Sequence, residues 1–369
     1  MTAPPPTPSS PRAEGRVASI DLLRGLAALA VCWFHLTGSA GPADPAIVAS
    51  GRYGEFGVDV FFVISGFVIP FSLQRSGYRL GDFWRFLLKR VARVDPPYLA
   101  SVAVAIGMAH LVSLVPGSRA VFRMPSAEQV LLHVGYAVPF VRSAEWLNPV
   151  FWTLAVEFQY YLVIGLAYPL IASRREAVSL LTTGVLLVSS ALLPQKEFFP
   201  AHAALFVLGI YIFRHRAGLS AFGVLLAVVC VALVAATVMR GVPAAVAGAL
   251  AAVAILTERS WARRPLPPAL LLLGSISYSL YLLHWPVGID AVAASRRLLP
   301  PFPGTDLLAR LVGLVASLVA AYAFYRLIEK PAQRVASRVG YRARHVTHDS
   351  ARRRATWEVQ RPSVAAATE

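Results

Sequence analysis

Apolar and polar residues follow one another along this chain in long blocks. Ten apolar runs are separated by short basic or Pro/Gly-rich stretches. A helix needs about 20 apolar residues to cross the hydrocarbon core of a bilayer, and most of these runs approach that length. The pattern therefore predicts an all-α polytopic integral membrane protein, a bundle of about ten transmembrane helices. The expected spans are residues 18–37, 56–73, 94–115, 150–172, 177–193, 201–213, 219–239, 243–257, 268–288 and 307–328, and the sixth and eighth are short for a full crossing.

The composition also favours a membrane protein. Hydrophobic residues make up 57% of the chain and charged residues 15%, whereas soluble domains carry about a quarter charged residues. The formal net charge of +16 is compatible with nucleic-acid binding. A nucleic-acid binder, however, carries its Arg on a soluble module, interleaved with aromatic residues. Here most Arg lie at the ends of apolar runs and in the C-terminal tail, so we expect membrane lipids as partners and no nucleic acid.

The positive charges also predict an orientation. With the N-terminus inside, the segments expected in the cytoplasm hold 24 Lys and Arg and the outer segments hold 9; without the C-terminal tail the ratio is 15 to 9. The positive-inside rule then predicts cytoplasmic N- and C-termini in a multi-pass protein of the inner or plasma membrane. The longest outer segment, residues 116–149, contains a short apolar stretch that fits a helix lying in the membrane interface.

Three parts of the chain differ in character. Residues 1–17 are rich in Pro and Ser and lack the apolar centre of a signal peptide, so we expect a disordered cytoplasmic tail. Residues 18–335 form the expected transmembrane domain, and residues 336–369 a basic, disordered cytoplasmic tail. Both cysteines lie inside apolar runs, which predicts no disulfide framework. No His, Cys and carboxylate cluster has metal-ligand spacing, so we expect neither a metal nor another cofactor.

Ionisable residues inside apolar spans are costly and indicate function. Arg24 and His35 both lie in the first run. Their separation of 11 residues puts them on one helical face, roughly 16 Å apart along the axis. Each has a structural alternative, since Arg24 could extend to the lipid interface and His35 could be a hydrogen-bonded structural histidine. One polar face that carries both favours a functional reading.

Further polar residues share the outer half of the expected membrane domain. Asp59 starts the second span, Glu157 lies in the outer half of the fourth, and His284 lies at the outer end of the ninth. Together with His35 they provide the groups needed for general-base chemistry on a hydroxyl. Agreement in depth does not establish that these side chains meet.

A basic stretch on the expected inner side precedes the third span. Lys89, Arg90 and Arg93 lie there, and the two arginines share one face if the stretch is helical. Arginine pairs suit bidentate phosphate binding. The alternative is anchoring of the protein to lipid headgroups.

Six motifs in order resemble the membrane-bound acyltransferase-3 family, which modifies bacterial surface glycans and secondary metabolites. The motifs are IDLLRGLAALAVCWFH (20–35), FGVDVFFVISGFVI (56–69), KRVARVDPPY (89–98), FWTLAVEFQYY (151–161), LLLGSISYSLYLLHWPV (271–287) and RLIEKP (326–331). Each is weak alone, and together they cover the whole expected membrane domain. The resemblance implies a ten-helix fold with both termini inside. Some members of the family carry an additional helix and an extracytoplasmic SGNH-type domain; because the residues after Pro331 are Arg-rich and hold no apolar run, we expect a member without that domain.

The resemblance further implies roles for single residues. His35 would be the catalytic histidine, with Arg24 and Glu157 as the other catalytic residues. Arg90 and Arg93, with Lys89, would bind the anionic part of an acyl-coenzyme A donor. The remaining site residues would line the substrate chamber; these are Asp59, Ser65, Tyr278, Tyr281 and His284.

These observations predict an O-acyltransferase. It would move an acyl group, most simply acetyl, from cytoplasmic acyl-coenzyme A, a co-substrate, to a hydroxyl of an extracytoplasmic glycan or glycosylated small molecule. His35 would act as the base, with Glu157 or Asp59 orienting its imidazole; an acyl-histidine intermediate stays open. The rival hypotheses are a secondary transporter or flippase, whose buried charges would bind substrate or relay protons, and a structural subunit. The acceptor, the acyl chain length and the oligomeric state are not readable from the sequence.

Overall fold

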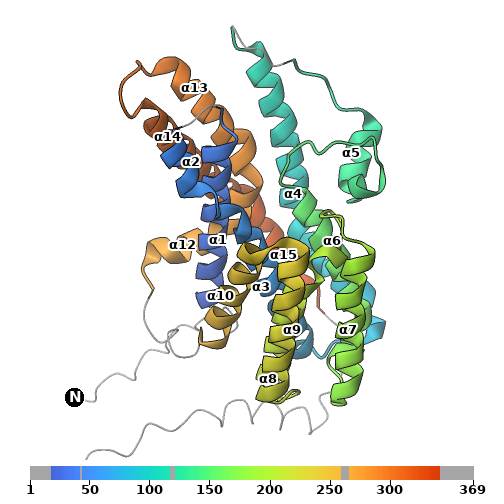
Figure 1. The fold of residues 1–369 in the computed structure, drawn as a ribbon. Coiled ribbons are helices and arrows are strands. Elements are labelled where there is room, and N and C mark those ends of the chain that lie inside the picture. The colour runs from blue at the N-terminus through green and yellow to red at the C-terminus, as the bar shows by residue number, and fades with distance from the viewer. Residues whose placement is uncertain (1–17, 42–43, 117–120, 259–265, 341–369) are drawn as a thin grey trace, which may run out of the picture.

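The computed structural model describes residues 18–41, 44–116, 121–258 and 266–340, and all regular structure in these residues is helical (Figure 1). Each of the ten predicted runs coincides with one main helix. These helices are α1 (Ala18–Gly38), α3 (Gly57–Arg75), α4 (Phe83–Leu114), α6 (Trp152–Ile171), α7 (Glu176–Leu192), α8 (Ala203–Arg216), α9 (Phe222–Arg240), α10 (Val242–Leu256), α12 (Pro268–Leu283) and α14 (Thr305–Phe324). Shorter elements connect them: α2 (Pro45–Gly51), α5 (Ala127–Val134), α13 (Asp290–Leu298), α15 (Lys330–Arg338), the 3₁₀ turns η1 (Gly54–Phe56), η2 (Leu80–Asp82), η3 (Val138–Phe140) and η4 (Phe199–His202), and the π-helical turns η5 (His284–Ile289) and η6 (Tyr325–Glu329).

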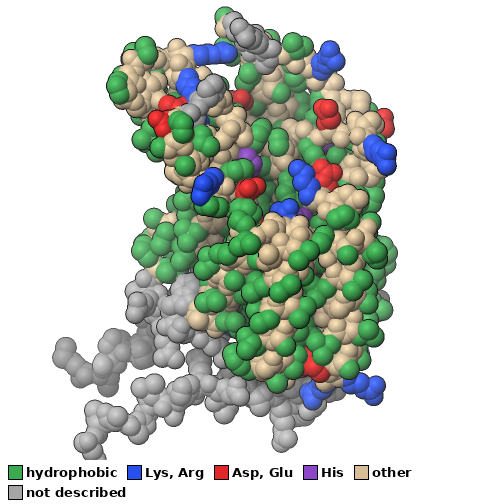
Figure 2. Space-filling model, viewed as in Figure 1, with side chains coloured by type: hydrophobic (Ala, Val, Ile, Leu, Met, Phe, Trp, Pro, Cys, Tyr) green, Lys and Arg blue, Asp and Glu red, His purple; other side chains and the backbone are tan. Residues whose placement is uncertain are grey.

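Seven helical segments in the described residues are long and apolar enough to cross a membrane, which confirms a multi-pass membrane protein. They are Ile20–Gly38, Pro45–Arg75, Leu80–Leu114, Trp152–Ile171, Phe222–Arg240, Pro268–Leu298 and Thr305–Arg338. Helices α7 and α10 are apolar but shorter. Large apolar side chains on α7 and α9 are exposed, among them Leu181, Val185, Val234 and Val238. Figure 2 shows a wide hydrophobic surface over these helices, with charged side chains above and below it. Such a surface fits contact with lipid.

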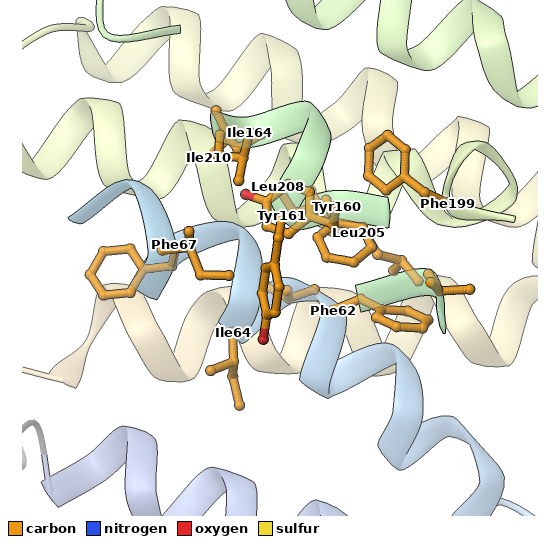
Figure 3. Packing of buried hydrophobic residues seen from close by; sticks show 14 of the residues in the cluster. Phe62, Ile64, Phe67, Tyr160, Tyr161, Ile164, Phe199, Leu205, Leu208 and Ile210 are labelled. Carbon is orange, nitrogen blue, oxygen red and sulfur yellow. The ribbon is translucent and has the colours of Figure 1, made fainter. Parts of the chain in front are cut away.

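Helix α8, the predicted short sixth span, lies inside the bundle. Every side chain from Ala203 to Arg214 is buried, and its apolar residues pack with those of α3 and α6 (Figure 3). Glycines allow α3 and α8 to touch backbone to backbone: a Cβ at Gly66 would lie 2.2 Å from the Phe206 oxygen, and one at Gly209 2.1 Å from the Val63 oxygen. Small residues at a crossing allow this close approach in membrane proteins.

A second glycine crossing brings α12 against α1, the first helix of the chain. A Cβ at Gly274 of α12 would lie 2.3 Å from the Asp21 oxygen of α1, and one at Gly25 would lie 2.8 Å from the Gly274 nitrogen. A larger side chain at either position would force α1 and α12 apart. The crossing therefore sets the separation between residues on α1 and residues at the end of α12.

The end of α12 is irregular because of Pro286. A proline lacks the N–H that would donate to the carbonyl four residues earlier, here that of Leu282. Asn148, which is fully buried, supplies the missing donor, since its Nδ2 donates to the Leu282 oxygen at 3.1 Å. The chain continues as the π-helical turn η5; such turns are frequent at functional sites.

Two predicted boundaries differ from the structure. The third span was expected to start at residue 94, but α4 starts at Phe83, so the basic stretch around Arg90 is part of a membrane helix. Helix α15 continues to Arg338, past the predicted end of the membrane domain at residue 335. In its described residues, the outer segment expected to contain an interfacial helix has α5 and η3, both too short to cross. Residues 1–17 and 341–369 of the predicted tails lie outside the described residues.

Candidate active site

The α1–α12 crossing places His35 directly against His284. His35 Nδ1 and His284 Nε2 are 2.9 Å apart, and the two rings stack with centroids 5.1 Å apart. His284 is fully buried, and its Nδ1 lies 3.1 Å from the Leu280 oxygen. Trp285 packs edge-on against the ring of His35. The sequence placed both histidines at one depth, and the structure shows them in contact.

The hydrogen bonds of this histidine pair fix which nitrogens carry protons. A carbonyl oxygen only accepts, so His284 Nδ1 carries the proton that bonds to Leu280. In a neutral ring His284 Nε2 is then an acceptor, and His35 Nδ1 must donate to it. The remaining nitrogen, His35 Nε2, carries a lone pair. The His35 side chain is half-buried, and the backbone of Val31, one helical turn earlier, is a further hydrogen-bond partner of its ring. The geometry therefore presents a base.

A cavity next to the histidine pair collects most of the other predicted residues. It is lined from α1, α3, α6 and α12 by Arg24, Val58, Phe61, Phe62, Ile64, Ser65, Thr153, Leu154, Glu157, Tyr278 and Tyr281. The Tyr281 ring lies 5.8 Å from that of His284, which connects the cavity to the histidine pair. The structure therefore unites Arg24, Ser65, Glu157 and the two tyrosines in one chamber.

Glu157 faces this cavity and not the imidazole. Its Oε1 accepts from Tyr161 at 2.7 Å and from Ser65 at 3.2 Å. The expectation that Glu157 or Asp59 orients His35 is not what the geometry shows, because His284 occupies that position. His284 can orient the His35 ring because the hydrogen bond between its own Nδ1 and the Leu280 oxygen holds its imidazole in place.

Asp59 lies apart from the chamber. It is fully buried, its Oδ1 lies 3.7 Å from Arg240 Nη2, and it does not line the cavity, although its neighbour Val58 does. Helical geometry explains the difference, since adjacent residues point about 100° apart. Asp59 therefore points away from the chamber, toward Arg240 at the end of α9.

The basic residues of α4 gather around the other end of the chamber. Arg93 interacts electrostatically with Arg24, Arg90 and the buried carboxylate of Glu329. Lys89 is half-buried beside them. The Nε atoms of Arg24 and Arg90 are buried and have no hydrogen-bond partner in the described segments. Buried donors without acceptors, in a cluster with surplus positive charge, fit an anion.

Three contacts hold this arrangement together. Tyr278 Oη donates to the Val94 oxygen at 3.0 Å, next to Arg93, and so joins α12 to α4. Tyr281 Oη bonds to Thr153 Oγ1 at 2.7 Å and joins α12 to α6. Glu329 accepts from the amide and hydroxyl of Ser279, at 3.2 and 2.5 Å.

Sequence reasoning missed Glu329 and Asn148 as site residues. The RLIEKP motif contained Glu329, but its partner Ser279 is 50 residues away. Asn148 lies in a connection between helices. The sequence feature that could have indicated it is Pro286, because a proline there leaves the Leu282 carbonyl without its helical donor. Both residues belong to the site through contacts with residues far away in the chain, which the sequence alone does not show.

The fold and the site together define a helical membrane protein that holds a histidine pair and an arginine cluster around one internal chamber. Comparison with known families gives the particular class. A family described as an acyltransferase domain matches residues 17–326, and the chain belongs to this acyltransferase-3 family. No solved structure matches the chain significantly.

Three curated relatives are similar to parts of the chain. BcsY of Komagataeibacter xylinus is named as a membrane-bound transacylase whose activity is itself inferred. It is 32% identical over 45% of this chain and 42% of its own length. The acyltransferase MdmB of Streptomyces mycarofaciens is 30% identical over 42% of this chain and 40% of its own. The peptidoglycan O-acetyltransferase OatA of Listeria monocytogenes is 32% identical over 40% of this chain and 23% of its own. Each match spans less than half of the relative's length.

Proposed function

We propose that this protein is a membrane-embedded O-acyltransferase. It moves an acyl group, most simply acetyl, from cytoplasmic acyl-coenzyme A to a hydroxyl of an extracytoplasmic glycan or glycosylated acceptor. The observation that carries the proposal is the 2.9 Å contact between His35 Nδ1 and His284 Nε2, from which we assign the lone pair of His35 to Nε2. The acyltransferase family and the O-acetyltransferase among the relatives support acyl transfer to oxygen.

The chemical steps follow from the histidine pair. His35 Nε2 takes the proton of the acceptor hydroxyl while its oxygen attacks the thioester carbonyl carbon. The tetrahedral intermediate collapses, the carbon–sulfur bond breaks, and the coenzyme A thiolate takes the proton from the imidazolium. His284 accepts from the charged ring and is itself anchored on Leu280. His284 thus has the orienting role that a carboxylate has in many catalytic triads. Attack by His35 Nε2 itself, which would form an acyl-histidine, is the alternative.

The donor phosphates bind to the cluster of Arg90, Arg93 and Lys89, with Arg24 between this cluster and the base. The buried, unpartnered Nε atoms of Arg24 and Arg90 support this assignment. Arginine suits the task because its planar fork matches two phosphate oxygens. The intact donor then extends from the basic cluster through the chamber toward His35.

The proposed topology has ten crossings and cytoplasmic termini. The excess of Lys and Arg in alternate segments, 24 against 9, supports it. In this orientation the α4 arginines face the cytoplasm, where acyl-coenzyme A is made, and the histidine pair lies near the outer surface. Donor and acceptor then approach from opposite sides, with no need for the donor to cross the membrane.

The test is isotope labelling of surface glycans in cells that lack the gene and carry a plasmid copy. His35→Asn keeps a polar side chain but removes the base, so labelled acetyl esters should disappear from the glycan. His215→Gln is the matched control, since His215 is also half-buried and bonds a backbone oxygen, but lies at the end of α8. Equal expression is checked by immunoblot. Normal labelling in cells with His35→Asn would refute the proposal.

A further inference from the structure

The cavity has an apolar half and a polar half. Two contacts show that α3 and α6 run parallel. Phe62 of α3 contacts Trp152 at the start of α6. Further along both helices, Ser65 of α3 donates to Glu157 of α6. Val58, Phe61, Phe62 and Leu154 therefore form one half, near the starts of α3 and α6. Arg24, Ser65, Glu157 and Tyr278 form the other half.

The apolar half is the part closer to the histidine pair. The segment that leads into α3 runs antiparallel to α1: Gly51 of α2 faces Thr37 and Phe34, Gly54 of η1 faces Ala30, and Gly57 at the start of α3 faces Ala27 and Val31. The start of α3 therefore lies beside the part of α1 between Arg24 and His35, and the rest of α3 lies further from His35. Ring contacts lead the same way, from Phe61 to Tyr281 at 5.9 Å and from Tyr281 to His284 at 5.8 Å. An apolar group in this half lies near the base.

Aromatic side chains close this half of the cavity. The Phe62 ring packs against His202 at 4.6 Å, Phe206 at 5.0 Å and Trp152 at 6.5 Å between centroids. His202 and Phe206 are fully buried behind it. A chain that enters the cavity meets this wall and cannot continue between α3 and α8.

The size of the space sets a limit on its occupant. The whole cavity, with its polar half included, has a volume of about 60 Å³. A water-sized group needs roughly 10–15 Å³ on the same measure, so the two halves together have room for at most about four to six such groups. An acetyl group has three non-hydrogen atoms, a butyryl group five, a hexanoyl group seven and an octanoyl group nine. Acetyl to butyryl fit, and hexanoyl does not.

We propose that the apolar half, formed by Val58, Phe61, Phe62 and Leu154, is the acyl-binding pocket and restricts the donor to chains of up to about four carbons. The inference rests on the proposed function, because it takes acyl-coenzyme A as the donor. It goes further by naming the residues that select the acyl group. The pantetheine arm, with its two amides, is far too large for this space and runs along the polar side toward the arginines.

Binding of non-reacting donors tests the pocket without knowledge of the acceptor. The probes are coenzyme A and acyl-coenzyme A analogues with a methylene in place of the thioester sulfur, measured by calorimetry on the full chain in nanodiscs. Affinity should rise about fourfold for each methylene from acetyl to butyryl, as expected for apolar burial. It should then fall from butyryl to hexanoyl and octanoyl.

Two substitutions in the wall should move this optimum in opposite directions. Phe61→Ala enlarges the pocket and should shift the tightest binding to hexanoyl, while Val58→Phe fills it and should make butyryl bind more weakly than acetyl. Coenzyme A itself should bind both variants as it binds the parent. Phe71→Ala is the matched control, a half-buried phenylalanine of α3 that does not line the cavity. It should keep the parent's chain-length profile.

The outcomes separate the inference from the proposed function. Affinity that keeps rising through octanoyl, or a profile that neither wall variant moves, overturns the acyl pocket and leaves the donor assignment standing. Equal changes for coenzyme A and every analogue would mean that the pantetheine arm occupies the cavity, which also overturns it. Absence of binding by coenzyme A and all analogues would refute the proposed donor, and the pocket with it.

Discussion

Replacement of His284 by Ala tests the histidine pair most directly. The substitution removes the His284 acceptor of the His35 Nδ1 proton and weakens the preference for Nδ1, so that the proton can move to Nε2, where it blocks the base. A neutral hydrogen bond contributes about 0.5–1.5 kcal/mol and one from a charged donor about 1.5–3 kcal/mol. The difference of about 1–1.5 kcal/mol is gained only as His35 becomes charged, and its loss lowers kcat about 5- to 13-fold. With loss of control over the tautomer, the total should be tenfold or more.

The assay is transfer of labelled acetyl from acetyl-coenzyme A to glycan in membrane vesicles, with kcat and the KM for the donor measured separately. The KM should change little, because His284 lies away from the arginines that bind the donor. His284→Gln should retain more activity than the alanine variant, since its side-chain oxygen can still accept a proton. A His284→Ala enzyme with the parent's kcat, or one affected only in KM, would refute this account of His35.

Three further predictions concern other parts of the site. Arg90→Lys keeps the charge and loses the planar fork, so the KM for acetyl-coenzyme A should rise more than the KM for the glycan. Arg85 is exposed on the same helix, and Arg85→Lys should change neither KM. Equal rises in both KM values for Arg90→Lys would indicate lipid anchoring. Asn148→Ala leaves the buried Leu282 oxygen without a donor and should lower thermal stability by about 1–3 kcal/mol together with kcat, and a fully stable, active variant would show that this bond is dispensable. In a cysteine-free background, single cysteines at residues 121–125 and 299–304 should react with an impermeant thiol reagent on intact cells and those at 76–79 should not; the opposite pattern would invert the topology.

The helices were predictable because hydrophobic runs and helix length are linked by the thickness of the bilayer. The shared face of Arg24 and His35 was also predictable, since it follows from helical geometry within one segment. The arrangement of segments was not. Hydropathy cannot distinguish α8, which is enclosed by protein, from α9, which is widely exposed, because both consist mainly of apolar residues.

Contacts across the bundle limited the prediction of the site. Depth alone suggested three partners of equal standing for His35, namely Asp59, Glu157 and His284, and of these only His284 contacts its ring. Asp59 fails to line the chamber because of its direction on α3, one residue from Val58, which does line it. Such differences depend on how each helix is rotated and where it crosses its neighbour. Glycines such as Gly25 and Gly274 allow a close crossing, but the sequence does not indicate which helix each of them faces.

The pairing of His35 with His284 joins positions that are 249 residues apart in the chain. During synthesis the arginines of α1 and α4 therefore exist long before the base has its partner. A nascent or truncated chain that lacks α12 and η5 keeps the arginines that we propose to bind the donor, but it has no His284 to contact His35. Under the proposed mechanism, turnover begins only when α12 and η5 have been inserted and docked against α1.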